Sequence, residues 1–150
     1  MAVRVYKTLP DELLAAADAI ADHFDGMGYR SHVEHSELGF PFTPTLLCRR
    51  GKITTVMIEV DSEIRPRKLD DWIRYARSSS KDTRIAVCLP STVDVPPERM
   101  AELRDKGVGL YFAFPERVVE QIGPADLALN VALPELRSLP QPIRELLGDA

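Results

Sequence analysis

Cysteine is scarce in this chain. Its 150 residues include two cysteines, Cys48 and Cys88, which are too few for a disulfide framework or a four-thiolate zinc site. Both lie in apolar, strand-like segments, which predicts buried and inert thiols. Long hydrophobic runs are also missing: none approaches the roughly 18 residues of a membrane span, and the first residues lack the apolar segment of a signal peptide. We therefore expect a cytoplasmic protein that does not enter the membrane.

A strong excess of charge of one sign is absent as well. Nineteen basic side chains stand against 23 acidic ones, for a net charge of −4. This balance excludes a protein that coats nucleic acid through bulk positive charge. A hydrophobic fraction of 45% is too high for a disordered chain. The length fits one domain, with an expected core over about 10–114 and an apolar, partly helical arm over about 115–150.

Hydrophobic periodicity predicts an α/β fold. Apolar residues at helical spacing predict helices over 10–24, 68–78, 97–106, 116–122 and 142–147. Apolar and β-branched runs predict strands over 32–38, 45–49, 53–63, 84–89 and 108–114. Up to residue 122 the order is αβββαβαβα, which indicates a mixed central sheet flanked by helices.

The strand expected over 53–63 carries two neighbouring carboxylates. Because side chains alternate along a strand, Glu59 and Asp61 share one face near its carboxyl end. Carboxylate oxygens are ligands that Mg²⁺ prefers. The alternative is a strand that emerges into solvent and has a polar end with no further role. The pattern leaves both interpretations open.

Two strand segments and the order of the elements resemble a known family. Pro44-Thr45 opens one strand, Arg49-Arg50-Gly51-Lys52 forms a hairpin turn, and Glu59-Val60-Asp61 lies on the next strand. Over about residues 10–114 this arrangement resembles the restriction-endonuclease-like superfamily, the PD-(D/E)xK nucleases. There, a Pro-Asp on the second strand and a Glu-x-Lys on the third serve metal-dependent hydrolysis. The resemblance implies a restriction-endonuclease-like fold.

Two of the three motif positions differ from the family pattern. Thr45 stands where the metal-binding Asp would be, and Asp61 stands where the Lys would be, whereas Glu59 matches. Threonine is a poor Mg²⁺ ligand, and Asp61 reverses the charge beside the position of the attacking water. We therefore predict a degenerate nuclease-like domain without catalysis or bound cofactor, acting as a binding or assembly module.

Two alternatives to this prediction stay open. The first is a Mg²⁺-dependent DNA endonuclease with a migrated active site. In it Glu59 and Asp61 hold the metal, Glu34 or Glu37 adds a ligand, and Lys68 supplies the displaced cation. The second is an unrelated α/β interaction protein whose element order matches by chance.

Basic side chains gather in one part of the chain. Residues 49–77 carry eight basic and five acidic side chains, so the segment is positive while the remainder is negative. The candidates for phosphate contact are Arg49, Arg50, Lys52, Arg65 and Arg67. They form two groups at opposite ends of the expected strand, roughly 30–35 Å apart, too far for one compact patch. The alternative is two solvated turns.

The segment over 127–139 is rich in leucine. Apolar surface beyond a complete core indicates either a homodimer interface or an arm folded back onto the core of its own chain.

Overall fold

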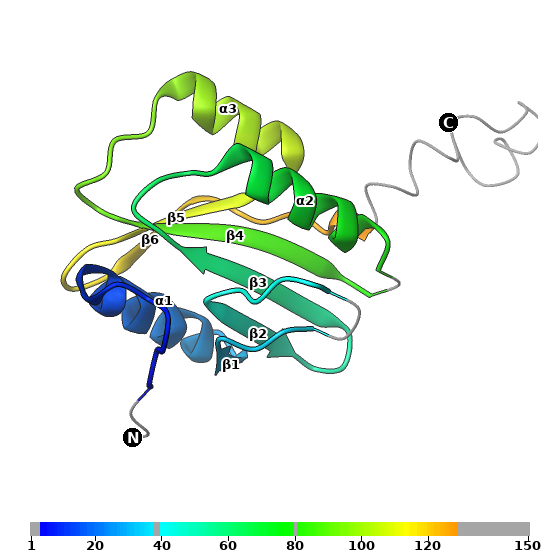
Figure 1. Ribbon diagram of the computed structural model, residues 1–150, viewed down its shortest axis with the longest axis horizontal. Helices are drawn as coiled ribbons and strands as arrows, with labels where there is room; N and C mark the ends of the chain where they lie inside the picture. The colour runs from blue at the N-terminus through cyan, green and yellow to red at the C-terminus, as the bar shows by residue number, and fades with distance from the viewer. Residues whose placement is uncertain (1–3, 38–39, 80, 129–150) are drawn as a thin grey trace, which may run out of the picture.

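The computed structural model describes residues 4–37, 40–79 and 81–128. A six-stranded mixed sheet in the order β1-β2-β3-β4-β5-β6 forms the central layer. Helix α1 covers one face of this sheet, and α2 and α3 lie on the other (Figure 1). The elements are η1 (Asp11–Leu13), α1 (Leu14–Gly26), β1 (Arg30–Val33), β2 (Leu46–Arg50), β3 (Thr54–Val60), α2 (Pro66–Arg77), β4 (Thr83–Pro90), α3 (Pro97–Lys106), β5 (Gly109–Ala113) and β6 (Val118–Ile122). The predicted α/β class with a mixed, helix-flanked sheet is confirmed.

The connections explain the strand directions. The strands β1, β2 and β3 form an antiparallel meander, whose second turn contains Gly51 at φ 66°, a conformation that glycine adopts without strain. The pairs β3–β4 and β4–β5 are parallel, and each needs a crossover, which α2 and α3 supply. The last strand, β6, returns antiparallel beside β5.

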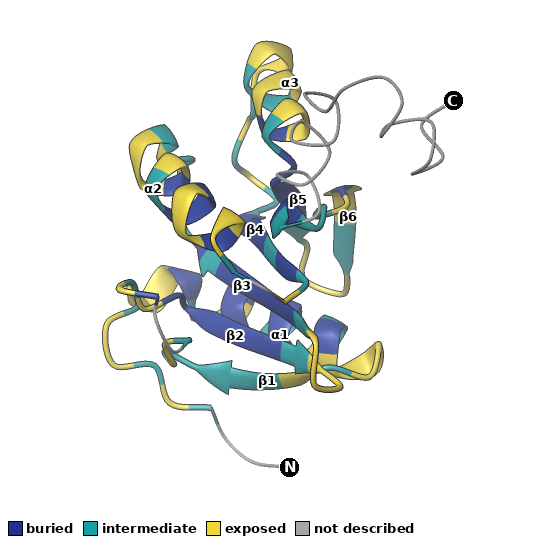
Figure 2. Cartoon of the chain, turned by 90° about the vertical axis from the view of Figure 1, so that its right-hand side faces the viewer, coloured by how far each residue is buried: buried dark blue, intermediate teal, exposed yellow. Residues whose placement is uncertain are grey.

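The strand β3 is buried on both faces. As its alternation predicts, Val56, Ile58 and Val60 pack toward α1, whereas Met57 packs toward α2. Figure 2 shows the buried middle of the sheet between its more exposed outer strands. The face of β3 that carries Thr55, Met57 and Glu59 is thus the face on which α2 lies.

The helix predicted over 116–122 is wrong: this segment contains the strand β6. Phe114 N–H donates to the Arg117 carbonyl at 2.8 Å and closes a tight turn, after which Val118 pairs with Ala113. The β-branched pair Val118-Val119 suits a strand, and the free edge of β5 offers it hydrogen-bond partners. Five residues, two of them polar, are too short a segment for hydrophobic periodicity to distinguish a helix from a strand.

Most other predicted elements are confirmed with shifted ends, and two of these shifts affect the candidate site. The first strand stops at Val33 and the third at Val60, so Glu34 and Asp61 each lie just past a strand end.

The core extends beyond residue 114, since Leu127 is fully buried. The helix predicted over 142–147 and most of the apolar arm lie outside the described residues. Among the residues described, no helix has the length and apolar character to cross a membrane.

Candidate functional site

Thr45 and Glu59 face each other across the β2–β3 ladder. Leu46 is paired with Ile58, so the next positions outward, Thr45 and Glu59, are neighbours. The Thr45 hydroxyl donates to Glu59 Oε1 at 3.1 Å and accepts from the Val60 N–H at 3.1 Å. Thr45 is buried, which shields this contact from water. The Thr45 hydroxyl therefore holds the Glu59 carboxylate in place at the end of β3.

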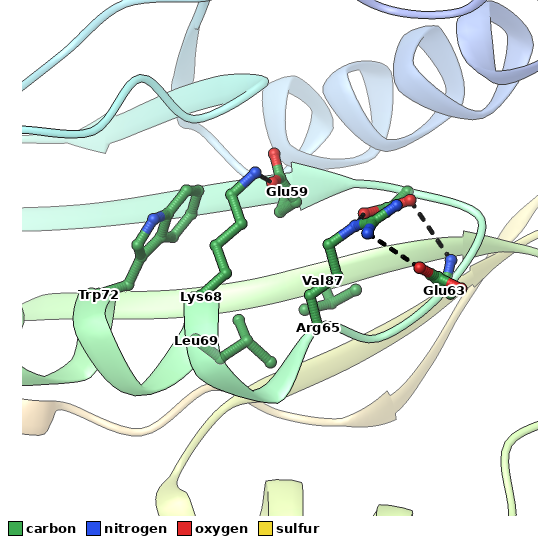
Figure 3. Close-up of a pocket in the computed structure, with 8 residues that line it drawn as sticks. Glu59, Glu63, Arg65, Lys68, Leu69, Trp72 and Val87 are labelled. Carbon is green, nitrogen blue, oxygen red and sulfur yellow. Dashed lines mark hydrogen bonds and ion pairs between the residues drawn. The ribbon is translucent and has the colours of Figure 1, made fainter.

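Lys68 forms an ion pair with Glu59 from the first turns of α2. Pro66 begins this helix, a position that suits proline because no helical partner is lost there. The Lys68 ammonium contacts Glu59 Oε2 and lies 5.6 Å from the centre of the Trp72 ring (Figure 3). The Glu59 side chain is 12% exposed and that of Lys68 is 43% exposed. The contact places the Lys68 ammonium at the carboxyl end of β3.

Asp61 shapes the turn between β3 and α2. Its Oδ1 accepts from the Ser62 N–H at 2.6 Å, and its Oδ2 accepts from Arg65 Nε at 2.7 Å. Arg65 also pairs with Glu63 at 2.9 Å (Figure 3), and the hydrogen bond to Asp61 raises the pKa of Arg65 above its usual value. Asp61 Oδ1 also accepts from the Glu63 N–H at 3.4 Å, and an aspartate that accepts from the backbone N–H two residues on stabilises a turn. Asp61 thus already has a structural role.

Glu34 fastens the N-terminal segment to the sheet. Its Oε1 accepts from the Lys7 N–H at 2.8 Å, and from the Thr8 N–H and hydroxyl at 3.1 and 3.2 Å. Its backbone has φ 46°, an unusual value for a residue other than glycine. The Glu34 N–H donates to the Thr45 carbonyl at 2.9 Å, which fixes the residue at the end of the meander.

These side chains line one cleft, which we call the Glu59 cleft. Its volume is about 310 Å³, and Thr8, Leu9 and Pro10 form part of its wall. Its charged lining residues are Glu12, Glu34, Glu59, Asp61, Arg65 and Lys68. Acidic groups outnumber basic groups there by two, so the cleft repels phosphate.

The Glu59 cleft fits Mg²⁺ poorly. Within the described ranges, no three His, Cys, Asp or Glu side chains lie close enough together to hold a metal ion. The oxygens of Glu59 are engaged by Lys68 and Thr45, those of Asp61 by Arg65 and the backbone, and Glu34 Oε1 by residues 7 and 8. A cation in the cleft would have to displace ammonium and guanidinium groups from their partners. Glu37 lies elsewhere, where it accepts from Arg49 at 3.1 Å.

The five residues predicted to contact nucleic acid lie in two separate groups. Arg49 and Arg50 end β2, and Lys52 lies in the turn that follows. Arg65 and Arg67 lie at the start of α2, beyond the other end of β3. Arg49 is paired with Glu37, and the Arg50 guanidinium lies 4.7 Å from the centre of the Tyr29 ring. Arg65 is held in the turn described above. The structure does not bring them together in one compact patch.

The N-terminal segment is the part of the site that the sequence pattern missed. Thr8, Leu9 and Pro10 line the cleft, and Arg4 pairs with Asp22 and Asp25 of α1, each at 2.8 Å. No periodicity marks these residues, since the segment is neither helix nor strand. Asp18, Asp22 and Asp25 are spaced so that they lie on one face of a helix. This acidic face is the sequence feature that could have indicated a basic partner such as Arg4.

The cysteines test one further prediction, and two histidines lie close together at the end of β1. Cys48 and Cys88 are buried and unpaired, which confirms the predicted burial, and burial raises the pKa of both thiols to about 12. His32 and His35 have ring centres 5.6 Å apart. Burial, and then the charges of neighbouring basic groups, lower the pKa of His32.

Comparison with known proteins gives the chain no family. No family model matches it, and no curated protein does. Among solved structures it is similar to the SPO1766 protein of unknown function from Silicibacter pomeroyi, at 19% identity with a TM-score of 0.47. The match covers 88% of this chain and 94% of that one.

Proposed function

We propose that this chain is a restriction-endonuclease-like domain in which internal ion pairs have replaced the metal site. In this proposal the domain does not hydrolyse DNA and acts as a binding or assembly module. The observation that carries the proposal is the pairing of both strand-end acids with cations of the chain itself, Glu59 with Lys68 and Asp61 with Arg65.

Three features support the nuclease-like part of the proposal. The β1–β2–β3 meander leads into α2, and the parallel strand β4 follows beside β3. Thr45 and Glu59 are side by side, as the family pattern requires of its two acidic positions. Glu59 also lines a cleft. These are the arrangements that the resemblance predicts for the corresponding positions.

The charges support the non-catalytic part. Metal-dependent hydrolysis of a phosphodiester needs acidic oxygens free to bind the ion, and the ion then stabilises the charge that develops on phosphate. Here Thr45 is a neutral donor to Glu59, and Asp61 stabilises a turn. The excess of acidic groups in the Glu59 cleft disfavours the approach of a phosphodiester.

Incubation of supercoiled plasmid DNA with the full chain and Mg²⁺ or Mn²⁺ tests the proposal. We expect no nicking above that of the Glu59→Ala variant at any metal concentration. Metal-dependent nicking that is lost in Glu59→Ala and retained in Glu102→Ala, an exposed acid on α3, contradicts the proposal.

That contradicting result would establish the second candidate function, a metal-dependent endonuclease with a migrated site. The observation in its favour is that Glu59, Asp61 and Lys68 line the same cleft. In that function Lys68 would assist the attacking water instead of neutralising Glu59.

We further propose that the domain assembles through its apolar C-terminal arm, one of the two interpretations that the leucine-rich segment over 127–139 leaves open. Light scattering on the purified full chain measures its mass in solution. A dimer that dissociates in the Leu133→Asp variant supports assembly through the arm, whereas a monomer at every concentration leaves binding of a different partner as the function.

A further inference from the structure

A second hollow lies on the same face of β3, toward the opposite end of the strand from the Glu59 cleft. We call it the Thr55 pocket. Its volume is about 370 Å³, within the range of sites for small molecules. Its lining residues come from β3, α2, the connection between α2 and β4, the start of β4 and the segment before β2: Glu37, Phe40, Thr55, Met57, Tyr75, Ala76, Ser78, Ser79, Lys81 and Thr83.

Two aromatic rings line the apolar side of the Thr55 pocket. The Phe40 ring is buried, Tyr75 is 42% exposed, and the two rings stand perpendicular with centres 6.2 Å apart. Phe42 packs against Tyr75 at 5.6 Å and holds it in place, while Met57 and Ala76 complete the apolar lining. The exposed Tyr75 ring, fixed in this way, offers a flat surface on which a planar molecule can stack, and the perpendicular Phe40 ring can meet the same molecule edge to face.

Hydroxyl groups supply the polar side of the pocket. Ser79 Oγ accepts from the Thr83 hydroxyl at 2.9 Å and from the Lys81 N–H at 3.2 Å. Both of its lone pairs are then used, so its own proton is left to donate, and no acceptor for that proton occurs among the described residues. The buried Thr55 hydroxyl donates to Glu37 at 3.4 Å and keeps its capacity to accept. The pocket thus offers both a donor and an acceptor to a heteroaromatic ring.

Lys81 gives the pocket its positive charge. No carboxylate in the described part of the chain pairs with its ammonium, whereas Glu37, the acidic residue of the lining, accepts from Arg49. At the nearby end of α2, Ser78 donates to the Tyr75 carbonyl through its N–H and its hydroxyl, which reduces the negative potential of that helix end. An anionic group is the natural partner of Lys81.

We propose that the Thr55 pocket binds a planar heteroaromatic molecule that carries one anionic group, a carboxylate or a phosphate. The ring stacks on the exposed face of Tyr75 and meets Phe40 edge to face. A ring nitrogen or oxygen accepts from Ser79, and the anionic group pairs with Lys81. This site is separate from the Glu59 cleft and independent of the function proposed for it.

Four probes test the proposal and separate the two anionic sources. Nicotinate carries a carboxylate and has nicotinamide as its uncharged match; adenosine 5′-monophosphate carries a phosphate and has adenosine as its match. Titrations of the ¹⁵N-labelled full chain, followed by NMR, give the affinity and the residues whose signals shift. We expect one anionic probe to bind saturably, to shift signals of residues that line the Thr55 pocket, and to bind more tightly than its uncharged match.

Variants separate the two halves of the site. Lys81→Ala should weaken the anionic probe about tenfold, the loss of one charge-assisted hydrogen bond, and leave the uncharged probe unchanged. Tyr75→Leu should weaken both members of the pair, and Lys52→Ala, an exposed lysine in the β2–β3 turn, should weaken neither. Unchanged far-UV circular dichroism would show that each variant is folded.

Two results would overturn the proposal: no saturable binding of nicotinate or adenosine 5′-monophosphate, or binding that neither Lys81→Ala nor Tyr75→Leu weakens. Neither result bears on the plasmid assay, which reports on the Glu59 cleft at the other end of β3.

Discussion

The contact between Glu59 and Lys68 predicts a measurable coupling between the two side chains. Glu59 is 12% exposed and is engaged by Lys68 and by the Thr45 hydroxyl. A hydrogen bond to a charged group contributes about 1.5–3 kcal/mol to stability. Glu59→Gln keeps the side-chain volume and an acceptor for Thr45, so we expect a loss at the low end, about 1.5 kcal/mol. For a chain of this size that loss lowers the melting temperature by about 3–6 °C.

Lys68→Met removes the ammonium and retains much of the aliphatic stem beside Trp72. It leaves the Glu59 carboxylate without its cation, and we expect a loss of about 1–2 kcal/mol. Because the two substitutions break the same interaction, the double variant should lose less than the sum of the single losses. The expected coupling free energy is about 1 kcal/mol. A coupling this size exceeds that of most exposed ion pairs because Glu59 is largely shielded from solvent.

Urea unfolding of the four proteins at pH 7 gives this coupling directly. Trp72 is the single tryptophan and is fully buried, so its fluorescence reports unfolding at a position next to Lys68. The pair Arg99–Glu102, exposed on α3 with an N–O distance of 2.7 Å, is the control and should show a coupling below about 0.5 kcal/mol. Losses at Glu59 and Lys68 that add within about 0.3 kcal/mol would refute the reasoning.

Three further predictions follow from titratable groups whose pKa is shifted by burial or partial burial. Cys48 and Cys88, whose pKa burial raises to about 12, should react with a thiol reagent at pH 8 only after unfolding, and rapid labelling of the native chain would contradict their burial. Burial raises the pKa of Tyr111 above its usual value, so the unfolded state loses this proton first and stability should fall as the pH rises past about 10. In the Tyr111→Phe variant, the urea midpoint of unfolding should fall less steeply with pH above about 10. The same slope in the variant and the wild-type chain would contradict the raised pKa of Tyr111. Burial lowers the pKa of His32 below 6.5, so the midpoint of its NMR titration should lie below that value. The stability that the neutral imidazole contributes should be lost as the pH falls toward this midpoint. A midpoint above 6.5 would be inconsistent with this environment.

The sequence predicted the layers of the fold well where hydrophobic periodicity was long. The strand β3 was recognisable because its seven residues are rich in β-branched side chains, and successive side chains of a strand point to opposite faces of the sheet. The helix α3 was recognisable because Gly107, which ends it in the left-handed conformation, is a residue that favours such an end. The strand β6 was missed because its identity depends on pairing with β5 and its own pattern is weak. Tertiary pairing of this kind overrides local propensity.

The sequence indicated which side chains lie near the end of β3, but not which groups each of them contacts. Alternation placed Glu59 on the correct face, and Lys68 was selected as the nearby cation. That Lys68 would contact Glu59 depended on the path of the turn after β3, which Asp61 and Arg65 determine. The role of Glu34 was unpredictable, since its partners at residues 7 and 8 lie in a segment without any periodic signal.

Binding of Mn²⁺ to the Glu59 cleft tests the central claim most directly, since the account holds that Lys68 and Arg65 already neutralise the acids. Electron paramagnetic resonance of free Mn²⁺ measures binding to the full chain without any need for a substrate. The account predicts that the wild-type chain and Glu59→Gln bind millimolar Mn²⁺ equally weakly. Saturable binding of one Mn²⁺ to the wild-type chain, lost in Glu59→Gln, would contradict it.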